Sequence, residues 1–284
     1  MKMIRDPRST APCVLVLGMF DGVHRGHQAL LMRGVALAEE HGLPLNVCTF
    51  EPHPLTVLRP ELAPPRLTTQ TERAQLMAGF GVDSLCVMHF TRGRADQQPE
   101  DFAEEMVRVF RPKWVVCGFN FTFGRAGRGN GELLAAYGRT HGYETVIVPE
   151  VILEGSTVSS TRIRRLLESG RVHEASRLLG HAFTLTGRTQ ELSARGVTAV
   201  RVSVPRGKAL PGDGAYACYM TVDGQHYPAV VWVRGGAVEA SPLDSCLVLR
   251  GRQVRLTFAR WLCADGEPQT DAAEKARSFF FSVE

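Results

Sequence analysis

The sequence predicts two domains, an α/β domain built on a parallel sheet and a small antiparallel β-barrel that follows it. Apolar runs such as Val14–Leu17 alternate with longer helix-like segments as far as Gly180, which indicates βαβ units. After Gly180, short β-type runs alternate with turns that contain Gly and Pro, which is typical of a barrel or sandwich. The chain has 284 residues, 44% of them hydrophobic, enough for two cores. We therefore place the domains at residues 1–182 and 183–284.

The elements of the first domain follow from hydrophobic pattern and end signals. The acidic pair Glu100 and Asp101 suits the first turn of a helix, and Gly42 suits a helix end. Strands are expected at Val14–Leu17, Leu45–Phe50, Ser84–Phe90, Trp114–Cys117 and Thr145–Pro149, and helices at Gln28–Glu40, Thr69–Gly79, Pro99–Phe110, Gly131–His141, Ser159–Glu168 and Val172–Leu179. Ligands of such a sheet bind beyond the carboxyl ends of its strands.

The second domain is predicted from shorter β-type runs. Strands are expected at Val197–Val204, Ala215–Val222, Tyr227–Val233 and Gln253–Phe258, and a final helix at Asp271–Phe281.

Composition excludes several classes of protein. The net charge of +4 comes from 33 basic and 29 acidic residues without a long basic run, so no nucleic-acid partner is expected. The seven cysteines form no C-x-x-C pair, which argues against a disulfide framework and favours a reducing cytoplasm. The apolar stretch Val14–Phe20 is too short to span a membrane and lacks a signal-peptide cleavage site, so no membrane partner is expected.

The segment GMFDGVHRGHQALL, Gly18 to Leu31, carries the strongest functional signal. It places His24 and His27 between a strand and a helix, where unpaired backbone N–H groups and the helix dipole attract anions. Gly22 and Gly26 let the backbone approach a ligand closely. Imidazole N–H groups there can donate to charge that develops on a phosphate chain. The alternative is a strand–turn–helix with two surface histidines.

Two further segments lie at expected strand ends. In TFEPHP, Thr49 to Pro54, two prolines stiffen a loop in which His53 faces a ligand or serves only the turn. In GFNFTFG, Gly118 to Gly124, Asn120 can both accept and donate hydrogen bonds. The alternating Phe119, Phe121 and Phe123 line an apolar pocket or belong to the core, and the pattern does not say which does which.

A last segment, SSTRIR, Ser159 to Arg164, opens a predicted helix. Its hydroxyls and N–H groups suit a helix start, and Arg164 suits bidentate phosphate binding. The alternative is a plain helix cap and a solvated arginine.

Taken in this order, and with LTTQTER at Leu67 to Arg73, these segments resemble the motifs of the bacterial bifunctional riboflavin kinase/FAD synthetases, members of the H-x-G-H nucleotidyltransferase superfamily. The resemblance implies a Rossmann-like nucleotidyltransferase domain that transfers AMP from ATP to FMN, giving FAD and pyrophosphate with Mg²⁺. It implies catalytic roles for His24 and His27, and no metal ligand is assigned with certainty. The implied ATP-binding residues are Gly18, Phe20, Asp21, Gly22, Gly26, Asn120, Ser160, Thr161 and Arg164, and the implied FMN-binding residues are His53, Phe121 and Phe123.

In this family the barrel domain phosphorylates riboflavin, and its G-F-P-T-A-N motif binds the Mg-nucleotide. The matching segment here is RGVTAV, Arg195 to Val200, anchored by LPGDGAYA at Leu210 to Ala217. Thr198 matches, but Val200 replaces the asparagine, and valine has no oxygen ligand for Mg²⁺. Glu239 matches the position of the catalytic base. The resemblance therefore predicts a degenerate kinase domain in which Thr198 and Glu239 are vestigial.

Two other functions stay open. Without a kinase, the acceptor need not be FMN, so a related nucleotidyltransferase with another phosphorylated acceptor is one alternative. A flavin- or nucleotide-binding regulator that no longer turns over is the other. Neither the oligomeric state nor protein partners follow from the sequence.

Overall fold

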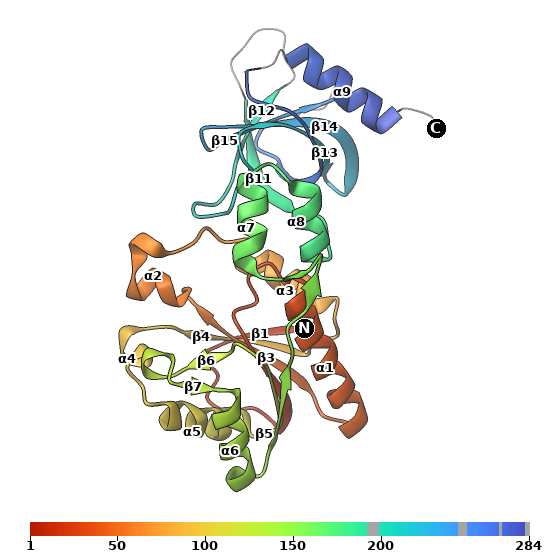
Figure 1. Ribbon diagram of the computed structural model, residues 1–284. Helices are drawn as coiled ribbons and strands as arrows, with labels where there is room; N and C mark the ends of the chain where they lie inside the picture. Colours follow the sequence, from red (N-terminus) through yellow and green to blue (C-terminus); the bar gives the residue numbers. More distant parts are fainter. Residues whose placement is uncertain (192–198, 244–248, 267–268, 282–284) are drawn as a thin grey trace. The chain divides into compact units, whose positions relative to one another are not determined.

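The computed structural model describes residues 1–191, 199–243, 249–266 and 269–281. The chain divides into two compact units, Met1–Val158 and Ser159–Glu284 (Figure 1). The helices predicted at Ser159–Glu168 and Val172–Leu179, which the sequence groups with the α/β domain, belong to the same unit as the barrel. The functional boundary near residue 182 stays a proposal.

The first unit is built on a six-stranded parallel sheet with the order β1-β4-β3-β2-β5-β8. The strands are β1 (Lys2–Arg5), β2 (Cys13–Leu17), β3 (Leu45–Glu51), β4 (Ser84–His89), β5 (Pro112–Gly118) and β8 (Glu144–Val148). From β2 the chain builds outward through β3 and β4 on one side, and through β5 and β8 on the other. The order therefore reverses between β2 and β5, and in such sheets ligands bind at the carboxyl ends of the strands on either side of that point.

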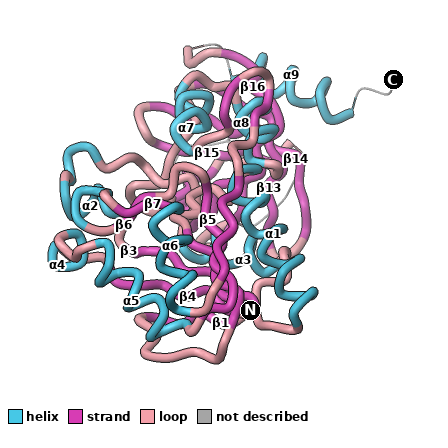
Figure 2. Tube along the Cα trace, turned by 60° about the horizontal axis from the view of Figure 1, so that its bottom comes forward, coloured by secondary structure: helices cyan, strands magenta, loops and turns pink. Residues whose placement is uncertain are grey.

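Helices cover both faces of this sheet, as Figure 2 shows. The helices are α1 (Arg25–His41), α2 (Pro54–Leu58), α3 (Gln70–Ala78), α4 (Arg92–Ala95), α5 (Pro99–Phe110) and α6 (Gly131–His141), with 3₁₀ turns at Pro60–Leu62 and Arg125–Gly127. One apolar cluster joins strand residues such as Leu15 to Phe102 and Leu134 of α5 and α6. The other joins Val16 to Leu31 of α1 and Met77 of α3. Every residue of β2 is buried because both faces are covered, which explains its uninterrupted apolar sequence.

Two short antiparallel pairs complete this unit. They are β6 (Thr122–Phe123) with β7 (Gly129–Asn130), and β9 (Ile152–Leu153) with β10 (Ser156–Thr157).

The second unit starts with two helices and continues as a closed antiparallel barrel, ordered β11-β12-β15-β14-β13-β16. Its elements are α7 (Ser160–Glu168), α8 (Val172–Leu179), β11 (Thr184–Glu191), β12 (Val200–Ser203), β13 (Gly214–Val222), β14 (Gln225–Arg234), β15 (Ala237–Pro242), β16 (Gln253–Cys263) and α9 (Gln269–Phe281). Helix α8 packs against β16, and α9 packs against β13, β14 and β16. Closure pairs every strand of the barrel on both sides.

The predicted fold class is confirmed, and the elements that the pattern missed are polar or short. β11 reads TLTGRTQE and β15 reads AVEASP, and neither has the apolar run that marks the other barrel strands. Helix α1 begins at Arg25, one turn before the predicted start at Gln28, because the His24 side chain caps it. Among the described helices, none has the length and apolar character that crossing a bilayer requires.

Candidate active site

The loop that leaves β2, Gly18–His24, is called the histidine loop below. Its backbone has positive φ at Phe20 (54°), Gly22 (85°) and Val23 (42°). A positive φ is costly for a phenylalanine and more so for a β-branched valine, so the surrounding structure must hold this turn in place. The loop lies beyond the carboxyl end of β2, next to the point where the strand order reverses.

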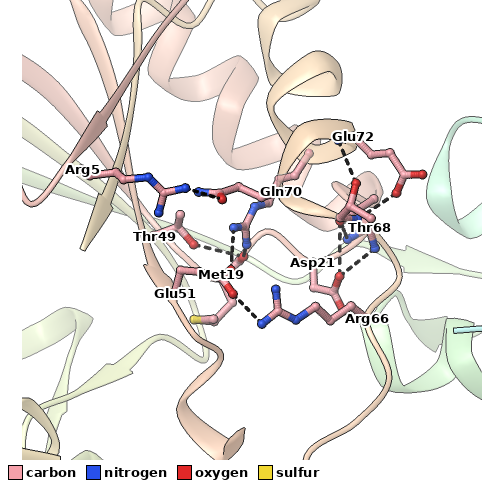
Figure 3. Close-up of polar contacts among 12 residues, drawn as sticks. Arg5, Met19, Asp21, Thr49, Glu51, Arg66, Thr68, Gln70 and Glu72 are labelled. Atoms are coloured by element: carbon pink, nitrogen blue, oxygen red, sulfur yellow. Dashed lines mark hydrogen bonds and ion pairs between the residues drawn. The ribbon is translucent and has the colours of Figure 1, made fainter. Parts of the chain in front are cut away.

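Asp21 and Thr68 fasten the histidine loop to the segment before α3 (Figure 3). The Asp21 carboxylate accepts hydrogen bonds from the backbone N–H groups of Leu67 (3.1 Å) and Thr68 (3.0 Å). In return, the Thr68 hydroxyl oxygen accepts from the Gly22 N–H at 3.0 Å. Asp21 and Thr68 are both buried, each 8% exposed. The carboxylate of Asp21 therefore positions the loop, and its implied contact with ATP stays a prediction.

A second attachment is made at the carbonyl of Met19. This carbonyl oxygen accepts hydrogen bonds from Nη1 of Arg73 at 3.0 Å and from the Thr49 hydroxyl at 3.2 Å. Nη2 of Arg73 donates to Oε2 of Glu51 at 3.2 Å, and Arg66 pairs with the other oxygen of Glu51 at 2.5 Å (Figure 3). The loop is thus held from β3 and from α3.

His24 is the N-cap of α1, and its ring is oriented by the helix that it caps. Nδ1 accepts from the backbone N–H of His27 at 3.4 Å, so it carries no proton in this arrangement. In neutral His24 the proton is therefore on Nε2. The rings of His24 and His27 stack with centroids 3.7 Å apart and an interplanar angle of 17°.

His27 is held in its neutral state by burial and by neighbouring charges. Its Nδ1 is buried and has no hydrogen-bond partner within the described residues. Burial lowers the pKa of His27 well below its ordinary value, and the charges of His24 and Arg73 lower it further. A proton on Nδ1 would be a buried, unsatisfied donor, so the proton of neutral His27 belongs on Nε2. Both stacked imidazoles thus carry an Nε2–H donor.

The glycines of this motif make room for protein side chains. A Cβ on Gly26 would lie 3.1 Å from Cε1 of His24, and one on Gly18 would lie 3.0 Å from the ring of Phe20. The Phe20 side chain is fully buried, so any contact with ATP at this position would come from its backbone. Glycine at both positions keeps His24 and Phe20 where the turn needs them.

His53 caps α2, as His24 caps α1. Its Nδ1 accepts from the backbone N–H of Leu55 at 3.2 Å. Its ring is half-buried, and the preceding Glu51–Pro52 peptide is cis. The implied contact with FMN stays a prediction.

The phenylalanines that follow β5 divide between surface and core. Phe123 is 6% exposed and its ring centroid lies 4.8 Å from that of Phe102, so it belongs to the core. Phe121 is half-buried and packs against the same core. Phe119 is 51% exposed, and Asn120 beside it is exposed too. The FMN contacts that the resemblance implies for Phe121 and Phe123 stay predictions.

Ser160, Thr161 and Arg164 belong to the second unit, at the start of α7. The Ser159 hydroxyl oxygen accepts from the backbone N–H of Arg162 at 3.2 Å and caps the helix. Arg164 is buried, with 9% of its surface exposed, which departs from a solvated arginine. The ATP contacts implied for these three residues remain predictions.

Of the vestigial kinase residues, Thr198 lies outside the described residues. Glu239 lies on β15, and its Oε1 pairs with Nη2 of Arg201 on β12 at 3.3 Å. Val200 is buried on β12, 6% exposed, where the family motif has asparagine.

The described part of the chain contains no group of three or more His, Cys, Asp or Glu side chains that could hold a metal ion. Mg²⁺ in nucleotide sites is commonly bound by substrate phosphates with few protein ligands, and such binding requires no cluster of this kind.

Comparison with known proteins finds a matching family model, similar sequences and a similar solved structure. Residues 6–162 match the family model described as FAD synthetase. The bifunctional riboflavin kinase/FMN adenylyltransferase of Escherichia coli is 32% identical over 279 residues, which cover 92% of this chain and 89% of that protein. An FAD synthetase of Listeria monocytogenes is 32% identical over 181 residues, 63% of this chain and 73% of that protein. A solved structure described as a macrolide-efflux protein from Streptococcus pneumoniae has a TM-score of 0.89 at 25% identity, covering 99% of this chain and 100% of that one.

Proposed function

Since the chain belongs to the FAD synthetase family, we propose that it transfers AMP from ATP to FMN, and that its barrel has little or no riboflavin kinase activity. The observation that best supports AMP transfer is the pair of stacked imidazoles at the N-terminus of α1, both with the proton on Nε2. The efflux function in the name of the similar solved structure does not account for this pair.

In the proposed reaction, a phosphate oxygen of FMN attacks the α-phosphorus of ATP, and the bond to the pyrophosphate oxygen breaks. The histidines form no covalent bond. The Nε2–H groups of His24 and His27 donate to phosphate oxygens as negative charge moves onto the leaving pyrophosphate, and the helix N-terminus adds a favourable field. A magnesium ion bound to the phosphates of ATP would neutralise part of the same charge.

The loss of kinase activity is proposed from the barrel residues. Val200 offers no oxygen to a metal ion, and Glu239 is paired with Arg201. The Escherichia coli relative named above is described as bifunctional, so this part of the proposal separates the chain from it.

One assay tests both parts. Purified protein is incubated with Mg-ATP and either FMN or riboflavin, and the flavins are separated by chromatography. We expect FAD from FMN and neither FMN nor FAD from riboflavin. FAD from riboflavin alone would show an active barrel, and no product from either flavin would favour another acceptor or a regulator.

A further inference from the structure

Arg73 is buried in a way that stability alone does not explain. The residue is 6% exposed, and two N–H groups of its guanidinium donate to the Met19 carbonyl and to Glu51. Its Nε is buried and has no hydrogen-bond partner within the described residues. Burying a guanidinium with one donor unsatisfied is costly, and an apolar side chain of similar size would avoid the cost.

The positive charge of Arg73 lies near the catalytic pair. Among the described groups, His24 and Arg73 are those whose charges act on His27, and both disfavour its imidazolium form. Glu51 and Asp21 act on Arg73 itself and favour its charged form, against the effect of burial and of Arg66. The carboxylates therefore keep Arg73 charged, and the charge of Arg73 adds to burial, the main cause, in lowering the pKa of His27.

The same side chain fixes the geometry of the turn. Its Nη1 holds the carbonyl of Met19, immediately before Phe20, whose ring contacts that of His27 at a centroid distance of 5.1 Å. Arginine can hold Met19 and Glu51 at once because its N–H groups form a rigid fork, and a single ammonium group cannot reproduce that fork.

We propose that Arg73 is a positioning residue for nucleotidyl transfer, which fixes the strained histidine loop through Met19 and thereby the Phe20 ring that contacts His27. This inference rests on the proposed function for its kinetic part only. It assigns a role to the last residue of the LTTQTER segment, Leu67 to Arg73, whose threonine Thr68 already fastens the same loop.

Three variants separate charge from geometry. Arg73→Met removes both, and Arg73→Lys keeps the charge but loses the fork. Arg94→Met is the matched control, because Arg94 makes a bidentate pair with Glu105 (2.8 and 3.1 Å) in the same unit without bonding to the histidine loop.

The effect of the Arg73 charge on His27 is tested without substrate, by nitrogen NMR of the His27 imidazole over a pH series. A His27→Gln spectrum assigns the signals. We expect wild type, Arg73→Lys and Arg94→Met to show neutral, Nε2-protonated His27 to well below pH 6.5. In Arg73→Met the pKa should rise, so that His27 protonates at higher pH. An unchanged titration in Arg73→Met would overturn the charge role.

The geometry is tested by kinetics with FMN and ATP. We expect kcat to fall on the order of 10²-fold in both Arg73 variants, because a small misplacement of catalytic groups has effects of that size, while KM for FMN changes little. The low-pH limb of kcat should move to higher pH in Arg73→Met alone. Unchanged kcat in two folded variants, or a loss seen only in KM, would overturn the positioning role.

A further variant covers the case in which Arg73→Met does not fold. Glu51→Gln leaves Arg73 less neutralised, so the His27 pKa must fall or stay the same, and a rise would contradict the inference. Arg73→Lys then tests whether the arginine fork is needed to hold the histidine loop. If the wild type makes no FAD, the proposed function fails, while the NMR titration still decides whether Arg73 controls His27.

Discussion

The histidine loop of the first unit and the surroundings of Glu239 in the second unit use their polar groups in different ways. Around the histidine loop, Asp21, Thr68 and Arg73 make hydrogen bonds that hold the backbone, and the imidazoles of His24 and His27 keep Nε2–H donors. Around Glu239, the carboxylate pairs with Arg201, and the neighbouring family position is the buried Val200. A residue that matches a family motif therefore indicates a function when its neighbours position it for chemistry. It indicates less when its side chain is already paired with another side chain.

The largest effect is expected when one of the two imidazoles is removed. His24→Ala or His27→Ala should lower kcat by on the order of 10²- to 10³-fold, because each removes a donor to charge that develops in the transition state. FMN affinity, measured by flavin fluorescence, should change far less. Equal losses in kcat and in FMN binding would contradict the catalytic role.

His141→Ala is the control for these variants. His141 is exposed at the end of α6, where its ring stacks on Tyr137 at a centroid distance of 4.6 Å. It should leave kcat unchanged. A comparable loss in this variant would indicate a general effect of removing a histidine.

How far the sequence predicts such a site is clear from particular residues. The strand–loop–helix around His24 and His27 follows from its apolar run, its glycines and the helix after it. The roles of Asp21 and Arg73 do not, because the groups that they bond lie 46 and 54 residues away along the chain. Only the folded sheet brings the LTTQTER segment to the histidine loop.

The phenylalanines after β5 show a second limit. The alternation of Phe119, Phe121 and Phe123 does not say which of them faces the core, and in the structure β5 ends at Gly118 and a turn follows. Phe119 is consequently exposed while Phe123 joins Phe102 in the core. Burial in a loop depends on the turn, which the sequence pattern does not specify.

A smaller effect is expected when one attachment of the histidine loop is removed. Thr68→Val deletes the oxygen that accepts from Gly22 N–H in a buried site. The free energy of unfolding should fall by about 1–3 kcal/mol, measured in urea. kcat should fall as well, since the loop carries His24 and leads into the helix that carries His27.

Thr71→Val is its matched control, because Thr71 is exposed on α3 only three residues away. A surface substitution of this kind should change the free energy of unfolding by at most about 0.5 kcal/mol. If both valine variants behave alike, the Thr68 hydroxyl does not hold the loop.

The smallest effect is expected at Glu239. Glu239→Gln removes an ion pair whose Arg201 side chain is 52% exposed, so solvent screening limits the loss of stability to less than about 1 kcal/mol. FAD formation from FMN should be unchanged, and riboflavin should remain unphosphorylated in wild type and variant alike. In a working kinase, the same substitution would remove the base and abolish FMN formation from riboflavin. Loss of a measurable riboflavin kinase activity in Glu239→Gln would therefore place Glu239 with the histidines, as a residue that its surroundings hold for chemistry.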